Sequence, residues 1–394
     1  MNNIKVICAL PKYSFGSKSR EYSTEYQSFY PEIKKKFVNT IYFNTINRKV
    51  SIEDMNKNFL NICLRFKPDY IFMSIANYEI YIETLILIKK KIRTILLNWC
   101  SDDSWRFEEH SKLYARFFDY SITTDKKSYT KYKLNRLNAI LANWGCPDNW
   151  LMKPKKSIEC KYDIIFIGSS YMGRKKIINK IRNDGYHVNC FGFGWNNRPV
   201  KSKKFSKLIN NSKIALNFSK SRKNILQTKA RIFEITGSGS LCITQNSDDL
   251  KFFFKNKNEL IVFRDYNDLK YKISYYLKNS KQRDKIALNG YEKCKKNYLY
   301  SKIISQIFNK IKYAEPKFKN LKIQYKNYHF SLFIFFLILK SISYLFLPIM
   351  SFQKIQKIFR RISFELEWRI RSELAYSKKG WTSKLYRDIN NNIL

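Results

Sequence analysis

The feature that most constrains the fold is an alternation of short apolar runs with polar or amphipathic segments, which occurs twice along the chain. Runs in which nearly every residue is apolar are typical of strands buried on both faces of a parallel sheet. Two such sets predict two doubly wound α/β domains, each a parallel sheet covered by helices. The first set comprises residues 4–10, 39–44, 69–75, 93–99, 120–125 and 139–144, and the second 162–168, 187–193, 213–219, 240–244 and 259–265.

The pattern breaks between the two sets at Gly145, Pro147 and Pro154, and such a break indicates an interdomain linker. A length of 394 residues also exceeds what one hydrophobic core usually organises. Ligands of open parallel sheets bind beyond the carboxyl ends of the strands, so we expect the site in a cleft that the two domains face. The expected parts are an N-terminal domain over residues 1–150, a second domain over 151–312 and a partly hydrophobic, basic helical tail over 313–394.

The tail contains an apolar stretch at residues 330–350, with 21 residues and one charge, Lys340. This approaches the roughly 20 apolar residues that span a bilayer, although Lys340 and Pro348 argue against a simple span. Further on, apolar residues recur every three or four positions beside a basic face, at Ile355, Phe359, Ile362, Leu366, Ile370 and Leu374. This pattern predicts a helix that lies on anionic lipid; the alternative is a helical hairpin packed on protein.

The chain is strongly basic, with a formal net charge of +44 from 75 Lys and Arg against 31 Asp and Glu. Such a charge suits nucleic acid, an anionic membrane or a phosphorylated substrate. The abundance of lysine, asparagine and isoleucine throughout is equally expected from an AT-rich genome. No RRM-like segment, helix-turn-helix or KH loop accompanies the charge, so a nucleic-acid-binding or RNA-modifying protein is retained only as an alternative.

Cysteine and histidine usage narrows the chemistry. The eight cysteines form no Cys-x-x-Cys pair and several lie in apolar runs, which predicts reduced thiols in a cytosolic protein. The three histidines are far apart in sequence, which argues against a zinc cluster or a histidine-based triad. Because the first residues lead directly into the strand-like "IKVICAL", we expect no signal peptide and a cytoplasmic location.

One segment, "ARIFEITGSGSLCIT" at residues 230–244, places Glu234 where a helix gives way to a buried strand. A carboxylate there can accept two hydrogen bonds from a ribose diol. Gly237 and Gly239 allow a tight turn and a close approach of the backbone to a ligand. The alternative is a surface Glu234 paired with Arg231, with glycines that serve only the turn. A nicotinamide-binding G-x-G-x-x-G is absent.

The residues after this segment continue an ordered series, "DDLKFFFKNKNELIVFRDYNDLKYKISYYLKNSKQRDKIALNGYEK" at 248–293. The N-terminal half adds "SDDSWRFEEHSKLYARFFDYSITTD" at 101–125. Together these motifs resemble the group 1 glycosyltransferases, in their spore-maturation-protein-like branch, over most of residues 1–312.

This resemblance implies a GT-B fold, in which two Rossmann-like domains hold a nucleotide-sugar donor mainly in the second domain and the acceptor in the first. It also implies sugar transfer without an obligatory metal or other cofactor. By position, Glu234 resembles the glutamate that binds the donor ribose, and Gly237 and Gly239 resemble the turn beside the diphosphate. The first glutamate of the Glu-x7-Glu motif found in some relatives is replaced here by Leu226, so its role does not transfer.

Further donor-binding candidates follow from phosphate chemistry. "FIGSSYMGRKK" at 166–176 ends a strand and opens a helix, so its small residues can offer donors to phosphate. Basic residues nearby can neutralise a diphosphate leaving group; the alternative for them is a solvated helix face. The candidates are Gly168, Ser169, Ser170, Arg174 and Lys175, followed by Lys229, Arg231 and Arg222.

On the acceptor side, an inverting enzyme needs a carboxylate to remove the proton of the acceptor hydroxyl. Asp102 and Asp103 follow the strand "TILLNW" at its carboxyl end and are the first candidates, with Glu25 a weaker one. The alternative is that one of the two aspartates caps the next helix. If configuration is retained, a front-face path needs no protein base, and Asp102 has a supporting role.

The sequence therefore predicts a metal-independent hexosyltransferase that moves a sugar from a nucleotide diphosphate to a hydroxyl of a glycan or lipid-linked acceptor in surface polysaccharide biosynthesis. The expected partners are the donor, the acceptor and an anionic membrane surface at the inner face of the cytoplasmic membrane, without nucleic acid. A non-catalytic nucleotide-binding scaffold of the same fold is a further alternative.

Overall fold

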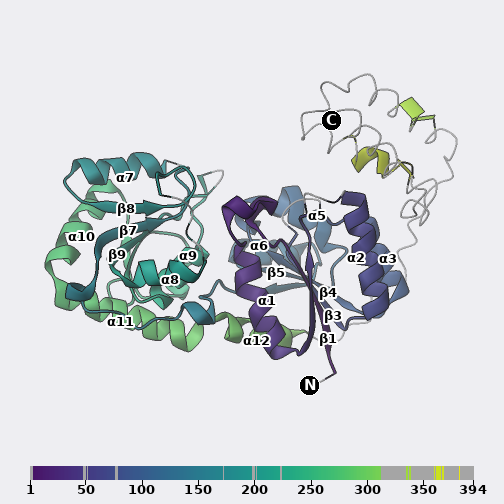
Figure 1. Cartoon of the computed structure of the whole chain (residues 1–394), viewed down its shortest axis with the longest axis horizontal. Coiled ribbons are helices and arrows are strands. Elements are labelled where there is room, and N and C mark those ends of the chain that lie inside the picture. The colour runs from purple at the N-terminus through teal and green to yellow at the C-terminus, as the bar shows by residue number, and fades with distance from the viewer. Residues whose placement is uncertain are drawn as a thin grey trace. The chain divides into compact units, whose positions relative to one another are not determined.

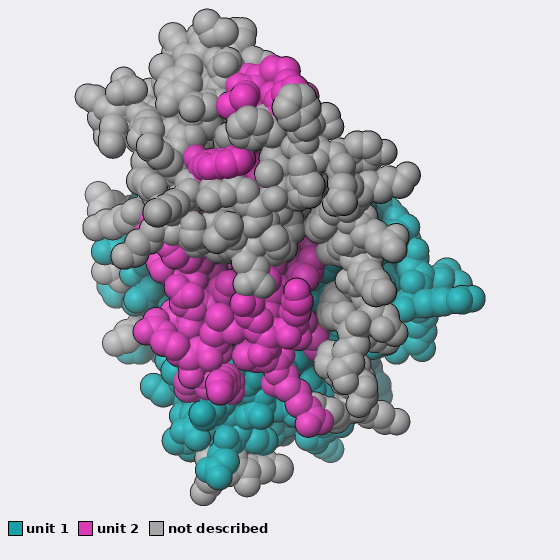
Figure 2. All heavy atoms as spheres, turned by 90° about the vertical axis from the view of Figure 1, so that its right-hand side faces the viewer, with its two compact units in different colours: residues 1–46, 68–77, 94–315 teal, residues 47–67, 78–93, 316–394 magenta. Residues whose placement is uncertain are grey.

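The structure is a computed structural model of the chain (Figure 1). It describes residues 3–47, 50, 52–75, 79–171, 173–197, 200, 202–221 and 224–311, with 334–335, 337–338, 359, 361–364, 366–367 and 381. The chain divides into two compact units, which Figure 2 colours teal and magenta. The first unit comprises residues 1–46, 68–77 and 94–315, and the second 47–67, 78–93 and 316–394.

The described residues form two sheets, both within the first unit, and every strand pair in them is parallel. The first sheet has the order β2-β1-β3-β4-β5-β6 and the second β11-β10-β9-β7-β8. The strands of the first sheet are β1 Lys5–Leu10, β2 Asn39–Asn44, β3 Tyr70–Met73, β4 Ile95–Cys100, β5 Tyr120–Thr123 and β6 Ala139–Leu141. Those of the second are β7 Tyr162–Ile167, β8 Val188–Phe191, β9 Ser212–Asn217, β10 Leu241–Gln245 and β11 Ile261–Phe263.

Helices alternate with these strands along the chain. Between strands of the first sheet come α1 Thr24–Lys36, α2 Ile52–Phe66, α3 Ile82–Lys91, α4 Asp103–Arg106, α5 Lys112–Ala115 and α6 Lys126–Leu134, with a π-helical turn at Phe107–Ser111. In the second half come α7 Arg174–Asn183, α8 Ser202–Asn210, α9 Ala230–Gly237, α10 Tyr266–Lys278, α11 Ser280–Asn297 and α12 Tyr300–Lys310. The predicted α/β architecture of two doubly wound parallel sheets is confirmed.

The second sheet is buried on both faces, as its continuous apolar strands require. Ile165 and Ile167 of β7 belong to a core that includes residues of α8 and α9. Ile164 and Phe166, which point to the opposite face, belong to a separate core with residues of α7 and α10. The two cores explain why alternate positions of one strand are equally apolar.

Helix α12 lies against the first sheet although it follows the last strand of the second. Tyr300 packs edge-on against Phe29 of α1, with ring centroids 5.2 Å apart, and Phe308 packs on Phe37 at 4.8 Å. Ile303, Ile304 and Ile307 share a core with residues of β1 and α1. Helix α12 therefore covers the first sheet, to which the first strand of the chain belongs.

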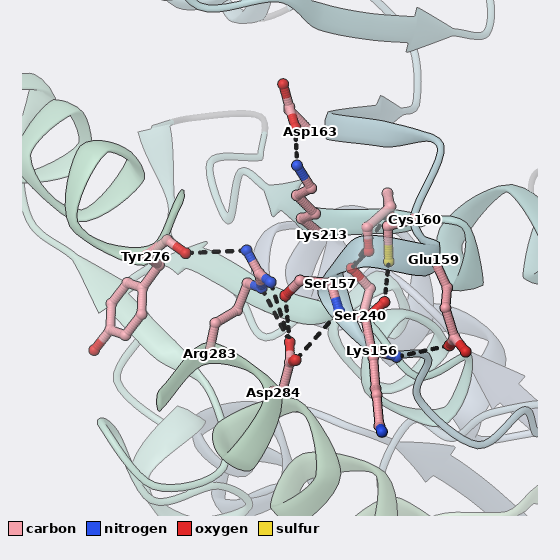
Figure 3. Close-up of polar contacts among 11 residues, drawn as sticks. Lys156, Ser157, Glu159, Cys160, Asp163, Lys213, Ser240, Tyr276, Arg283 and Asp284 are labelled. Atoms are coloured by element: carbon pink, nitrogen blue, oxygen red, sulfur yellow. Dashed lines mark hydrogen bonds and ion pairs between the residues drawn. The ribbon is translucent and has the colours of Figure 1, made fainter. Parts of the chain in front are cut away.

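The segment between the two sheets is held by polar contacts to α11 (Figure 3). Ser157 donates its backbone N–H and its hydroxyl to the two carboxylate oxygens of Asp284, at 3.2 and 2.8 Å. The buried Arg283 donates to Asp284 at 3.2 Å and to the Tyr276 carbonyl at 3.2 Å. Asp284, which also accepts from Arg283, thus holds the end of the predicted linker against α11.

The apolar stretch predicted at 330–350 lies outside the described residues apart from Ile334, Phe335, Leu337 and Ile338, which are helical and exposed. In the part of the chain that the structure describes, no helix has the length and apolar character needed to cross a membrane. Of the predicted basic helix, the described part includes Phe364, which is buried with its ring 4.6 Å from that of Tyr81. Arg361 pairs with Glu83 at 2.8 Å. This stretch packs on α3 of its own unit, as the alternative of a protein-packed helix predicts.

The turn between α9 and β10 is packed tightly on the linker. A Cβ at Gly237 would lie 2.5 Å from the sulfur of Cys146. Gly239 has φ +79°, and a Cβ there would lie 2.5 Å from the carbonyl oxygen of Met152. Both glycines are therefore required by neighbouring protein atoms, since neither position has room for a side chain.

We expect Gly239→Ala to lower the free energy of unfolding by at least about 2 kcal/mol, because alanine adds a left-handed backbone cost and a collision with Met152. Denaturant titration followed by circular dichroism measures this. Gly185→Ala is the matched control, since Gly185 has φ +90° with no atom within 4 Å of the added Cβ, and should cost about 1 kcal/mol. Equal losses in the two variants would contradict a tight packing at Gly239.

Candidate functional site

The main candidate site is a cavity within the first unit, at the carboxyl ends of strands from both sheets. It encloses about 780 Å³ not filled by atoms, the open solvent at its mouth included. From the half that carries the first sheet it is lined by Thr24, Glu25, Ser101, Asp102 and Trp144. From the other half it is lined by Phe166, Ile167, Gly168, Arg174, Asn217, Phe218, Gln227, Lys229, Ala230, Arg231 and Glu234. The cavity lies beyond the strand ends, where the sequence predicts the site.

Glu234 lies in the middle of α9 and lines this cavity while being only 4 % exposed. Burial raises the pKa of its carboxyl, and the nearby Arg231 opposes that rise. Arg231 Nη1 lies 2.8 Å from Glu234 Oε2, the pair that the alternative placed on the protein surface. The pair exists, but it lies at a cavity wall, where its second carboxylate oxygen can accept from a ligand.

Three cations converge on the same cavity. Arg174 opens α7, and Lys229 and Arg231 stand at the start of α9, whose unpaired N–H groups add partial positive charge. Burial lowers the pKa of Arg174, with repulsion from Arg231 as a further cause, and its buried Nε has no hydrogen-bond partner within the described residues. Burial also lowers the pKa of Lys229 to about 8, which Asp102 partly opposes. Cations that repel one another in a shared cavity favour an anionic ligand.

Other donor-side candidates fall at different distances from the cavity. Gly168 lines the cavity. Ser169 does not line it, but its carbonyl and hydroxyl oxygens each accept from Nη1 of the lining residue Arg174 at 3.3 Å. Ser170 and Lys175 are not among the lining residues. The backbone N–H of Ser170 donates to the Phe193 carbonyl, and Lys175 is exposed. Arg222 lies outside the described residues.

Gly237 and Gly239 were predicted to lie beside a diphosphate, but they are absent from the cavity lining and instead contact the linker. Their small size is explained by Cys146 and Met152, which occupy the space that the prediction assigned to a ligand. The glycines position the end of α9, and so act on the cavity through the helix that carries Glu234.

Two of the three predicted acceptor-side carboxylates line the cavity. Asp102 follows β4, and Glu25 lies in the first turn of α1, where it accepts from the Ser101 hydroxyl at 3.1 Å. Burial raises the pKa of Glu25, with the Asp102 carboxylate as a lesser cause in the same direction. Asp102, after β4, and Glu25, in the first turn of α1, therefore line the same cavity as the three cations.

Asp103 does not line this cavity. It begins α4, is 3 % exposed, and accepts from the Tyr132 hydroxyl at 3.0 Å on Oδ2. Burial raises its pKa to about 6, while the neighbouring hydroxyls of Ser111, Thr123 and Tyr132 oppose that rise. No side-chain hydrogen bond caps α4 through Asp102. Asp103 thus packs beneath the loop that presents Asp102.

Nine lining residues were not predicted from the sequence, among them Trp144, Asn217 and Gln227. The indole Nε1 of Trp144 is buried and has no hydrogen-bond partner in the described part of the chain. Asn217 ends β9 and donates to Thr244 at 2.8 Å, and Gln227 accepts from the Ser104 hydroxyl at 2.6 Å. Trp144 is the last residue of a predicted strand and Asn217 lies two residues before the end of another, which was the available signal.

One protein-family model matches part of the chain. Residues 174–309 match the family model described as glycosyl transferase-like. A search of curated protein sequences finds no match.

Solved structures share the fold at low identity. The Anabaena protein HepE, in complex with UDP-glucose, is 10 % identical, with a TM-score of 0.56 over 77 % of this chain and 98 % of its own. Sucrose-phosphate synthase from Thermosynechococcus elongatus is 10 % identical, with a TM-score of 0.52 over 77 % of this chain and 98 % of its own. The lipopolysaccharide outer core galactosyltransferase WaaB is 12 % identical, with a TM-score of 0.50 over 78 % of this chain and all of its own. The predicted GT-B fold is confirmed, and the family match agrees with the predicted glycosyltransferase.

Proposed function

We propose that the protein is a glycosyltransferase that binds a nucleotide-diphosphate sugar in the cavity and transfers the sugar to a hydroxyl of a glycan or lipid-linked acceptor. The observation that carries this proposal is the buried Glu234 beside Arg174, Lys229 and Arg231 in one cavity. A nucleotide diphosphate presents a diol and adjacent negative charges, and these groups match a carboxylate set next to cations.

In the proposed complex, Glu234 accepts hydrogen bonds from the ribose hydroxyls and the start of α9 faces the diphosphate. As the bond between the anomeric carbon and the diphosphate oxygen breaks, negative charge grows on the leaving group. Arg174, Lys229 and Arg231 stabilise that charge. We propose on this ground that transfer requires no metal and no other cofactor.

The acceptor oxygen forms its new bond to the anomeric carbon and gives up its proton. Asp102 is the proposed base, because it follows a strand end and lines the cavity, and Glu25 is the second candidate. If configuration is retained, Asp102 instead orients the acceptor. Asp103 is proposed as a positioning residue beneath Asp102, since it lies outside the cavity.

The finer assignments rest on the sequence motifs and on the neighbours. The motifs favour the spore-maturation-protein-like branch, and HepE bound to UDP-glucose and the galactosyltransferase WaaB favour a hexosyl donor and a surface polysaccharide. We propose a cytoplasmic location, peripheral at the inner face of the membrane. The exposed Ile334, Phe335, Leu337 and Ile338 support membrane contact, since adjacent exposed apolar residues suit insertion at a lipid interface.

The first test concerns Glu234 and the ribose. We expect the wild-type protein to bind 2′-deoxy-UDP roughly tenfold or more weakly than UDP, because a hydrogen bond to a buried charged group is lost. In Glu234→Gln that difference should shrink to a few-fold, as measured by isothermal titration calorimetry.

The comparison of two ligands in one variant removes the effect of freeing Arg231 from its partner. Asp163→Asn, which alters an exposed pair with Lys213, is the control and should keep the wild-type difference. An undiminished difference in Glu234→Gln would show that another group reads the diol.

The second test uses the titration of Lys229. Its pKa in the free protein is about 8, so the side chain loses its charge as pH rises from 7 to 9, and a diphosphate binds the charged form. Affinity for UDP should therefore fall by about tenfold across this range.

Lys229→Arg should remain charged and show a flat profile, apart from titration of the ligand itself, which both proteins share. Lys229→Met should bind weakly at every pH in the range. A wild-type profile that parallels Lys229→Arg would contradict a diphosphate contact by Lys229.

The third test concerns the membrane. The full chain should sediment with vesicles that contain anionic lipid, whereas a chain ending at Tyr313 should not. Replacing Phe335 and Ile338 by serine should reduce sedimentation severalfold, while Leu288→Ser, which changes an exposed leucine of α11, should leave it unchanged. Equal sedimentation of all four proteins would refute the membrane proposal.

A further inference from the structure

A second cavity of the first unit adjoins the proposed donor site. It encloses about 1100 Å³ not filled by atoms, open solvent included. Ser101 and Gln227 line both cavities. The Ser104 hydroxyl, which lines the second cavity, donates to Gln227 Oε1 at 2.6 Å. The two cavities therefore meet at the polar side chains of Ser101 and Gln227, and Ser101 precedes Asp102 in the chain.

The charge of this second cavity is opposite to that of the chain. Four carboxylates line it, Asp103, Asp125, Asp248 and Asp249, against two cations, Lys127 and Lys131. Both cations have partners: Lys127 pairs with Asp248 at 2.7 Å and Lys131 with Glu108 at 3.3 Å. In a chain of net charge +44 a local excess of carboxylates is not a consequence of composition.

The remaining carboxylates are set at different depths. Asp125 caps α6 by accepting from the Ser128 N–H at 2.7 Å, so part of its capacity is used. Asp249 is partly buried, and its pKa is raised by burial and then by the charges of Asp125 and Asp248. Asp103 is buried among the hydroxyls of Ser111, Thr123 and Tyr132, so its capacity is largely used. Acceptor oxygens crowded around a cavity favour a ligand that donates hydrogen bonds.

We propose that this second cavity receives the acceptor, and that its carboxylates select a glycan that enters with hydroxyl or ammonium groups and carries no phosphate there. This rests on the proposed function, because the donor must occupy the first cavity. A phosphorylated group would meet like charges at Asp125 and Asp249, and juxtaposed like charges disfavour a wrong partner. The acceptor hydroxyl would reach the donor past Ser101, beside the proposed base Asp102.

The test measures binding of three matched probes to the full chain saturated with UDP, by ligand-observed NMR titration: methyl glucoside, methyl glucosaminide and glucose 6-phosphate. The first two should bind at least tenfold more tightly than the third. Asp249→Asn should weaken methyl glucosaminide severalfold. Asp249→Lys should reverse the preference between methyl glucosaminide and glucose 6-phosphate.

Two controls separate the possible failures. Asp163→Asn should leave binding of all three probes unchanged, and thermal melting should confirm that each variant is folded. Binding of UDP alone is measured in every protein: loss of UDP binding by the wild type would overturn the proposed function itself. If UDP binds normally while glucose 6-phosphate is preferred, or while the Asp249 variants match wild type, the acceptor assignment is wrong.

Discussion

The arrangement of the site depends on a carboxylate that is held inside the protein at Glu234. Removing a charged carboxylate from water is unfavourable unless it is paired and hydrogen-bonded, and Arg231 supplies that partner at 2.8 Å. The pairing keeps Glu234 in place without using all of its acceptor positions. Arg174 and Lys229 have no comparable carboxylate within hydrogen-bonding distance in the described structure, and burial lowers the pKa of each. The cavity lining carries three carboxylates and three cations, so its preference for an anion comes from the grouping of Arg174, Lys229 and Arg231 and not from an overall excess of positive charge.

The fold brings these groups together through the ends of two secondary-structure elements. Helix α7 begins with Arg174 shortly after β7, and α9 begins just after Lys229, so both helix starts meet the cavity. The end of α9 is fixed separately, because Gly237 and Gly239 allow the linker to pack directly on the backbone. One turn of the chain therefore sets the orientation of α9, and through it the position of Glu234. The polar contacts of Ser157 with Asp284 hold the same linker from the other side.

Much of this architecture could be predicted because it is local in the sequence. Continuous apolar runs identify buried parallel strands, and Asp102 follows a strand whose carboxyl end marks a ligand edge. Glu234 was expected where its helix ends, but it lies in the middle of α9. The return of α12 to the first sheet could not be predicted, because its apolar face fits either sheet equally well. Asp103 and Asp102 are adjacent in sequence, yet one is buried under the other; this difference depends on Tyr132, about thirty residues away. The glycines were predicted for the correct turn but for a ligand contact, since sequence alone does not show that the linker fills that space.

The two cavities differ in charge, and this difference gives the site a direction. Cations and carboxylates are equal in number in the first cavity, with Arg174, Lys229 and Arg231 grouped together, whereas carboxylates outnumber cations four to two in the second. An anionic donor is drawn to the first cavity and repelled from the second, so a diphosphate has one favourable position. In the proposed complex, the sugar of a donor held in this way lies near Ser101 and Gln227, which line both cavities. The net charge of the whole chain does not determine the orientation of the donor. It acts at long range, on the approach to a membrane or a substrate, whereas the choice between two bound orientations depends on charges within a few ångströms. The difference in charge between the two cavities thus disfavours a donor bound in the reverse orientation, which the shape of the cavities alone would not do.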